Sequence, residues 1–237
     1  MIISLSGLTG SGKTLTMVML AKKEGESKKI MTNINGLKFK HHRLKKADLF
    51  KKVIDDKKTN SRTIHYKTDV NWDFWIKNNR SSIFLDEAHN IIENRAFNSQ
   101  ENKAASRWVA QIRKVCEESG DYRRLEIIRK LSRFYFSKTI YDEIARHNNL
   151  YITSQTVDRL EKNFRDLSNV HIHCTCKHLS DGSMLVFNHF FFSSVFHSAI
   201  TNFRDGLQKP KVGVFIANPY FDKYDRFMIV RSDDEYL

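Results

Sequence analysis

Short apolar runs alternate with amphipathic segments along most of the chain, which predicts strands followed by helices. The first run, residues 2–6, ends at a glycine-rich turn, and from Lys13 onward apolar residues recur at helical spacing. Further strands are expected at the other short apolar runs, residues 29–34, 63–67, 82–85, 150–154, 170–176 and 184–192. The pattern of residues 101–147 is mostly helical. Strands separated by helices indicate an α/β fold with a mainly parallel sheet.

Two other segments have patterns of their own. In the lysine-rich residues 38–58, apolar residues stand at helical spacing, which predicts a helix; they are Leu44, Leu49, Phe50 and Val53. Toward the C-terminus, residues 212–230 have strand character. The turn sequence at residues 180–182 predicts that the two strands around it form a hairpin.

Composition narrows the class of protein. Of the 237 residues 41% are hydrophobic, enough for a substantial core, and 9 glycines with 2 prolines exclude collagen-like and low-complexity structure. The formal net charge of +13 suits an anionic partner, either nucleic acid or an anionic membrane face. Three cysteines make no disulfide framework, so a reducing compartment is expected. The most apolar stretch, residues 184–200, contains Asn, His and Ser, which favours a buried strand and helix over a membrane span.

The glycine-rich turn after the first strand matches the phosphate-binding motif G-x-x-x-x-G-K-[ST] in full, over residues 7–14. Glycines let backbone N–H groups turn toward an anion, and the N-terminus of the following helix adds a favourable dipole. In such a loop Lys13 contacts the β- and γ-phosphates of ATP, and the Thr14 hydroxyl ligates Mg²⁺. The residues expected to bind the nucleotide are Gly7, Thr9, Gly10, Ser11, Gly12, Lys13, Thr14 and Leu15.

Two later strands end in polar residues suited to phosphoryl transfer. Asp86 and Glu87 follow one apolar run, and Gln155 follows another. Because the carboxyl ends of parallel strands meet at one edge of a sheet, these side chains are expected near the phosphates. We expect Asp86 to hold Mg²⁺ and Glu87 to orient and polarise the attacking water. Gln155 is expected to reach the γ-phosphate or the same water.

Residues 7–14, 84–90 and 152–155 together resemble the HerA/FtsK branch of P-loop ATPases. Within it the chain is most similar to the zonula occludens toxin (Zot) domain and the assembly ATPases of filamentous phages. The resemblance implies a three-layer α-β-α P-loop NTPase fold over residues 1–177, with bound ATP and Mg²⁺. It leaves residues 178–237 as a small β-rich C-terminal extension, and residues 115–148 are expected to be a helical insertion.

The same resemblance implies a homo-oligomeric ring, a hexamer or pentamer, with the nucleotide at a subunit interface. In such a ring an arginine from the neighbouring subunit stabilises the charge of the transition state. Arg165, just after the third motif, is the preferred candidate, ahead of Arg95, Arg107 and Arg113. A solvated helix face is the alternative place for each of them.

Basic side chains concentrate in residues 38–58 and 107–138. The ones suited to track a DNA backbone, in duplex or single-stranded form, are Lys45, Lys46, Lys51, Lys52, Arg123, Arg124, Arg129 and Arg133. A solvated helix face explains them equally well from the sequence alone. No motif resembles a base-reading element.

Residues 171–178 alternate in the period of a half-buried strand. We expect Ile172 and Cys174 on the buried face and His171 and His173 on the solvated one. Zinc binding is disfavoured, because side chains on opposite faces do not converge on one ion and the usual ligand spacing is absent.

Three function classes follow from these features. The leading hypothesis is an oligomeric ATPase motor of virus assembly that translocates or packages DNA into a capsid, in the host cytoplasm or at a packaging vertex of the virion. The alternative is a Zot-like assembly or extrusion ATPase with membrane or coat-protein partners. The C-terminal transmembrane helix of filamentous-phage assembly proteins is missing, which favours the first hypothesis. A small-molecule kinase is disfavoured, because no lid signature is recognisable.

Overall fold

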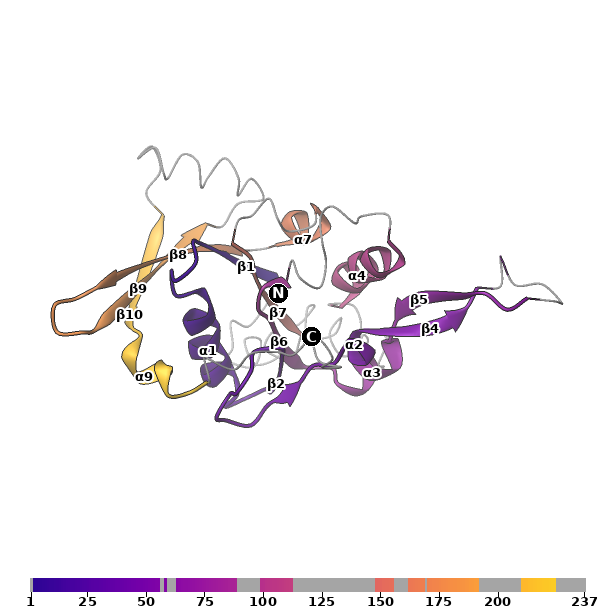
Figure 1. Ribbon diagram of the computed structural model, residues 1–237, viewed down its shortest axis with the longest axis horizontal. Coiled ribbons are helices and arrows are strands. Elements are labelled where there is room, and N and C mark those ends of the chain that lie inside the picture. Colours follow the sequence, from indigo (N-terminus) through magenta and orange to yellow (C-terminus); the bar gives the residue numbers. More distant parts are fainter. Residues whose placement is uncertain are drawn as a thin grey trace, which may run out of the picture.

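The computed structural model describes residues 2–55, 58, 63–88, 99–112, 148–155, 162–168, 170–191 and 210–224, without the side chains of residues 162, 163 and 165. Within these residues the main element is one sheet in the order β10-β9-β8-β1-β7-β6-β2-β3 (Figure 1). Its strands are β1 (Ile2–Ser6), β2 (Lys29–Thr32), β3 (His42–Arg43), β6 (Ser81–Leu85), β7 (Asn149–Thr153), β8 (Val170–His178), β9 (Met184–Phe191) and β10 (Lys211–Ile216). The six strands from β8 to β3 are parallel, and β9 pairs antiparallel with both of its neighbours.

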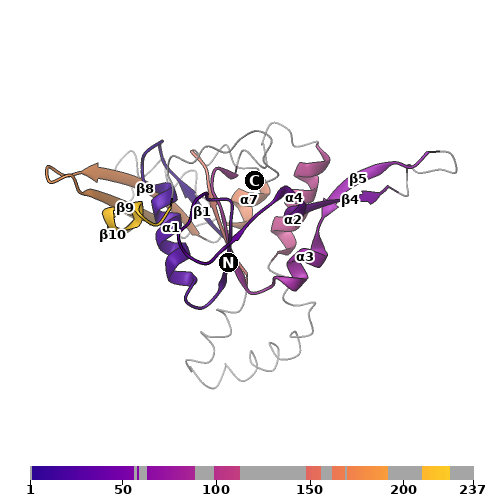
Figure 2. The ribbon, with the colours of Figure 1, turned by 60° about the horizontal axis from the view of Figure 1, so that its bottom comes forward.

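Helices cover both faces of this sheet and give three layers (Figure 2). On one face α1 (Lys13–Glu24) buries Met17 and Val18 in an apolar cluster with Leu5 of β1. The short α9 (Asn218–Phe221) packs beside it. The opposite face carries α3 (Trp72–Lys77), α4 (Gln100–Gln111) and α7 (Lys162–Leu167), which bury Trp75, Trp108 and Phe164. The predicted mainly parallel α-β-α architecture is confirmed.

The order of the central strands decides which chain segments meet. β7 lies between β1 and β6, in parallel register with both. The carboxyl ends of β1, β7 and β6 therefore lie side by side, and the loops that follow them converge at one edge of the sheet.

The predicted hairpin around residues 180–182 is present, since β8 and β9 pair from His171 to His178. This hairpin and β10 continue the central sheet beyond the predicted boundary at residues 177–178. The division of the chain into an ATPase domain and a C-terminal extension stays a prediction.

A second, two-stranded sheet projects from the body, formed by β4 (Phe50–Ile54) and β5 (Tyr66–Val70) (Figure 1). The helix predicted within residues 38–58 is wrong except for one turn, α2 (Lys46–Leu49). Leu44 and Leu49 are fully buried, whereas Phe50 starts the strand and faces Val70 across the hairpin. Strand pairing has overridden a weak helical spacing here. We call this hairpin the β4–β5 arm.

The prediction that His171 and His173 lie on a solvated face is wrong. Residues 171–174 of β8 point alternately to the two faces of the sheet and all of them are buried, so both faces are covered here; the exposed fractions of His171 and His173 are 0% and 7%. Both ring nitrogens of His171 bond serine hydroxyls of β1, Nδ1 to Ser4 and Nε2 to Ser6, each at 2.8 Å. Burial, followed by the charge on His173, lowers the pKa of His171 to about 3. Within the described part of the chain, no three or more His, Cys, Asp or Glu side chains come together in a group that could hold a metal ion.

Several predictions fall on residues that the structure does not describe. They are the helical insertion up to residue 147 and the basic candidates Arg95, Arg113, Arg123, Arg124, Arg129 and Arg133. Among the helices that are described, none has the length and apolar character needed to span a membrane.

Candidate nucleotide site

The loop of residues 7–12 connects β1 to α1 at the centre of the sheet edge. Two of its glycines are required by close approach. A Cβ at Gly12, where φ is 90°, would come within 2.6 Å of a Val186 methyl, and one at Gly7 would lie 2.5 Å from the Cys174 carbonyl oxygen. The loop is thus fitted tightly onto β8 and β9. Leu8, Thr9 and Gly10 form its exposed outer part.

Lys13 curls over this loop from the first turn of α1. Its ammonium donates hydrogen bonds to the carbonyl oxygens of Gly7, at 2.9 Å, and Leu8, at 3.1 Å. The Ser11 hydroxyl is buried and has no hydrogen-bond partner among the described residues. A buried, unpartnered hydroxyl beside a positive charge fits a phosphate group, which accepts hydrogen bonds from both. The Leu15 side chain instead packs into an apolar cluster with Val186.

Thr14 and Asp86 meet although 72 positions separate them in the chain. The Thr14 hydroxyl donates to Oδ2 of Asp86 at 2.7 Å, which joins the loop to the end of β6. A hydroxyl and a carboxylate oxygen are donors that Mg²⁺ prefers. This pair therefore fits a magnesium ion beside the phosphates.

Two residues to which the sequence analysis assigned no role hold Asp86 in place. Asn33, directly after β2, accepts from the Asp86 N–H at 2.7 Å and donates to its carbonyl at 2.8 Å. Thr153, the last residue of β7, donates its hydroxyl to Oδ1 of Asp86 at 2.5 Å. Both lie at the carboxyl ends of strands that flank β6. A polar residue at a strand end was the signal that could have identified both, but recognising that these strands flank β6 requires the strand order.

Glu87 follows Asp86 with φ at 49°, in the left-handed region that non-glycine residues rarely adopt. Such a conformation costs about 1 kcal/mol or more, and Glu87 retains it because its N–H donates to the Thr153 hydroxyl at 2.7 Å. Asp86 and Glu87 both lie beyond the end of β6, in a turn rather than in the alternation of a strand. The Thr153 hydroxyl thus fixes both acids at once.

Gln155 lies beside the start of the loop. Its backbone carbonyl accepts from the Gly7 N–H at 3.4 Å, and Ser154 donates its N–H to the Leu5 carbonyl at 3.0 Å. The Gln155 side chain is half-buried. The third predicted motif is therefore adjacent to the first, one strand away from the acids.

Of the four arginine candidates, Arg107 and Arg165 fall within the described residues. Arg107 of α4 pairs with Asp69 of β5 in the same chain, Nη2 to Oδ1 at 3.1 Å. Arg165 belongs to α7, and its side chain is not described.

Comparison with protein families identifies one that matches most of the chain. The model of the family described as Zonular occludens toxin (Zot) matches residues 1–182. Among solved structures, the N-terminal domain of zonular occludens toxin from Neisseria meningitidis matches at a TM-score of 0.50 and 18% identity, over 94% of this chain and 98% of that one. The genome packaging NTPase B204 from Sulfolobus turreted icosahedral virus 2, in complex with ATP-gammaS, gives a TM-score of 0.39 and 9% identity, over 92% and 93%. No curated protein matches the chain.

Proposed function

The chain belongs to the zonular occludens toxin (Zot) family, and from that membership and its nucleotide site we propose that it is an ATP-hydrolysing oligomeric motor of virus assembly. We further propose that the motor translocates DNA, packaging it into the capsid. The observation that carries the proposal is the Thr14–Asp86 hydrogen bond at 2.7 Å, because it unites the phosphate loop with the acidic end of β6.

Each group at the site has a part in the proposed hydrolysis. Lys13 binds the β- and γ-phosphates, and Thr14 with Asp86 holds the magnesium ion. When bound, Mg²⁺ supplies positive charge that offsets the charge developing on the phosphates. Glu87 orients the attacking water and polarises it, and Gln155 positions that water or the γ-phosphate. Asn33 and Thr153 are positioning residues, since they act by holding Asp86 and the Glu87 backbone.

The assembly we propose is a ring of five or six copies in the host cytoplasm, which can engage a capsid vertex. Each nucleotide lies at a subunit interface, where Arg165 of the adjacent copy adds positive charge to the transition state. Ring closure then couples hydrolysis in one subunit to a DNA contact in the next.

The experiment measures ATP turnover with and without duplex DNA at low salt, together with the mass of the protein in solution. The proposal expects DNA to stimulate turnover and the mass to exceed that of one chain. Hydrolysis that ignores DNA at every salt concentration would remove DNA translocation from the function.

Family membership itself favours a second candidate, a Zot-like assembly or extrusion ATPase that acts with membrane or coat-protein partners. It predicts stimulation by anionic vesicles or coat protein in the same assay, with no response to DNA. The two candidates share the site and differ in the partner that accelerates it.

A further inference from the structure

We propose that a lysine-lined hollow at the root of the β4–β5 arm binds the phosphodiester backbone of DNA. The inference rests on the proposed function and gives it a contact site that family membership does not assign. The hollow has a volume of about 390 Å³, and its lining residues are Lys45, Lys46, Ala47, Phe50, Lys51, Lys52, Thr68 and Glu101. Four lysines and one carboxylate therefore surround one cavity.

The lysines are held loosely enough to exchange partners. Lys46 pairs with Glu101 at 2.8 Å and Lys51 with Asp73 at 2.6 Å, and in both pairs the side chains are well exposed to solvent. Exposed pairs of this kind contribute at most about 1 kcal/mol, so a phosphate can replace the carboxylate. Within the described chain Lys52 is exposed and has no ion-pair partner. The hollow thus offers mobile positive charges without a matching number of acids.

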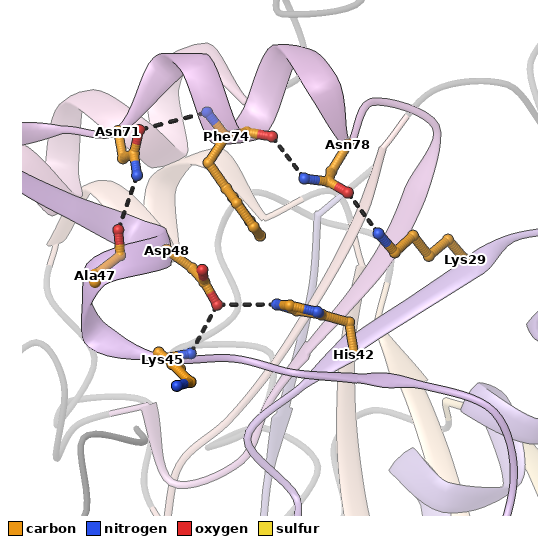
Figure 3. A network of polar contacts seen from close by, with 8 residues as sticks. All are labelled: Lys29, His42, Lys45, Ala47, Asp48, Asn71, Phe74 and Asn78. Carbon is orange, nitrogen blue, oxygen red and sulfur yellow. Dashed lines mark hydrogen bonds and ion pairs between the residues drawn. The ribbon is translucent and has the colours of Figure 1, made fainter.

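Two residues that line the hollow, Lys45 and Ala47, belong to a network of polar contacts (Figure 3). Asp48 accepts from the backbone N–H of Lys45 at 2.9 Å and bonds Nε2 of His42 at the same distance. Asn71 begins α3 by accepting from the Phe74 N–H, and it donates to the Ala47 carbonyl at 2.8 Å. The short α2 is thereby tied to both β3 and α3. Lys45 and Lys46 therefore project from a turn that is hydrogen-bonded on two sides, which lowers the ordering cost of binding.

The location of the hollow links it to the nucleotide site. It follows the carboxyl end of β3, and the carboxyl ends of the parallel strands also carry the phosphate loop and Asp86. Leu44, which precedes Lys45, donates its N–H to the Thr32 carbonyl at 2.8 Å. Asn33, which follows Thr32 in the chain, holds the Asp86 backbone. Few residues therefore separate the magnesium-binding acid from the lysines.

A second lysine-lined hollow provides a matched comparison. Its volume is about 500 Å³, and it is lined by Gly25, Ser27, Lys28, Lys29, Ile30, Lys40 and His41. It lies at the amino end of β2, opposite to the edge that carries the nucleotide site. Because both hollows are lined by lysines, comparing them shows whether DNA binding depends on the position of the lysines or only on their charge.

Lysine chemistry at a concave site favours a nucleic-acid backbone over a membrane. Lysines neutralise successive phosphates without reading bases, and a hollow can enclose a strand of phosphates. A membrane would instead meet the exposed apolar residues farther along the arm, Ile54 and Tyr66. The inference therefore commits to DNA, and lipid binding is an outcome of the test.

The experiment compares the full chain with two double variants that each remove two positive charges. Lys46→Gln with Lys52→Gln alters the hollow of the arm, and Lys28→Gln with Lys40→Gln alters the second hollow. Binding of labelled duplex and single-stranded DNA is measured across salt concentrations, with vesicles of anionic lipid as a separate arm. Thermal unfolding checks that each variant is folded. A single variant, Lys52→Gln, replaces the first pair if that pair does not fold.

The arm variant is expected to bind DNA at least about tenfold more weakly at low salt, with a salt slope smaller by about two. The second variant is expected to bind within about twofold of the unaltered chain. Equal losses in both variants, or none in the arm variant, would overturn the inference and leave DNA translocation standing. Loss of vesicle binding alone would assign the hollow to lipid and also overturn it. An unaltered chain that binds no DNA would instead refute the proposed function.

Discussion

Two polar clusters of the central sheet have opposite characters. The strand-end cluster of Thr14, Asn33, Asp86 and Thr153 lies where the parallel strands finish, beside the phosphate loop. The serine–histidine cluster of Ser4, Ser6, His171 and His173 lies within β1 and β8, between 0% and 7% exposed. The first cluster adjoins a loop that fits phosphate, whereas in the second the serines use both ring nitrogens of His171. The same residue chemistry can thus form a ligand site at a strand end and a neutral internal network within the strands.

The largest effect is expected from removing the Asn33 side chain, which holds the Asp86 backbone in the strand-end cluster. Asn33→Ala leaves the N–H and carbonyl of Asp86 without these partners, which costs about 1–3 kcal/mol for each buried group. A misplaced Asp86 should also lower ATP turnover by about tenfold or more. Turnover and the free energy of unfolding are measured together.

Asn218 gives the matched control, because it also clamps a backbone with both of its amide atoms. It accepts from the Met184 N–H at 2.9 Å and donates to the Gly182 carbonyl at 3.5 Å, at the turn between β8 and β9, and neither bond involves Asp86. Asn218→Ala should lower stability while turnover stays within about twofold. Similar turnover losses in both variants would mean that Asn33 acts only through stability.

The serine–histidine cluster should make stability sensitive to acid. The pKa of His171 is about 3 in the fold and near 6.5 in the unfolded chain, so between these values the unfolded state binds the extra proton. The stability contribution is fully present above pH 6.5 and is lost as pH falls toward 3. The free energy of unfolding in urea is measured across this pH range. In His171→Gln it should fall less with decreasing pH than in the unaltered chain, whereas in His178→Gln, a change at an exposed residue, it should fall as much. An NMR titration of His171 near pH 6.5 would contradict the assignment.

One contiguous motif and two strand ends predicted where the candidate site residues lie, whereas the roles assigned to these residues stay predictions. Residues 7–14 identified the loop, and the two later strand ends placed Asp86 and Gln155 at the same edge of the sheet. The role of Asn33 and Thr153 in holding the acids was not predicted, because it depends on the order β7-β6-β2, which no local pattern contains. His171 was placed on the wrong side for the same reason, since alternation cannot reveal that β8 is covered on both faces.

The arm shows a different limit of local patterns. A helical spacing of four apolar residues predicted one helix, yet only one turn forms before Phe50 enters a strand. The partner strand, β5, lies more than ten residues farther along the chain, so the pairing that decided the outcome is not local. The lysines were noted in the sequence, but their arrangement around one hollow depended on this hairpin.

The central claim is that the phosphate loop and the strand-end acids form one nucleotide site. The most direct test measures ATP binding and turnover in two variants, Glu87→Gln and Lys13→Ala. Glu87→Gln should bind magnesium ATP within a few-fold of the unaltered chain while turnover falls by about a hundredfold or more, and Lys13→Ala should lose nucleotide binding. Normal turnover in Glu87→Gln, or unchanged nucleotide affinity in Lys13→Ala, would contradict the account.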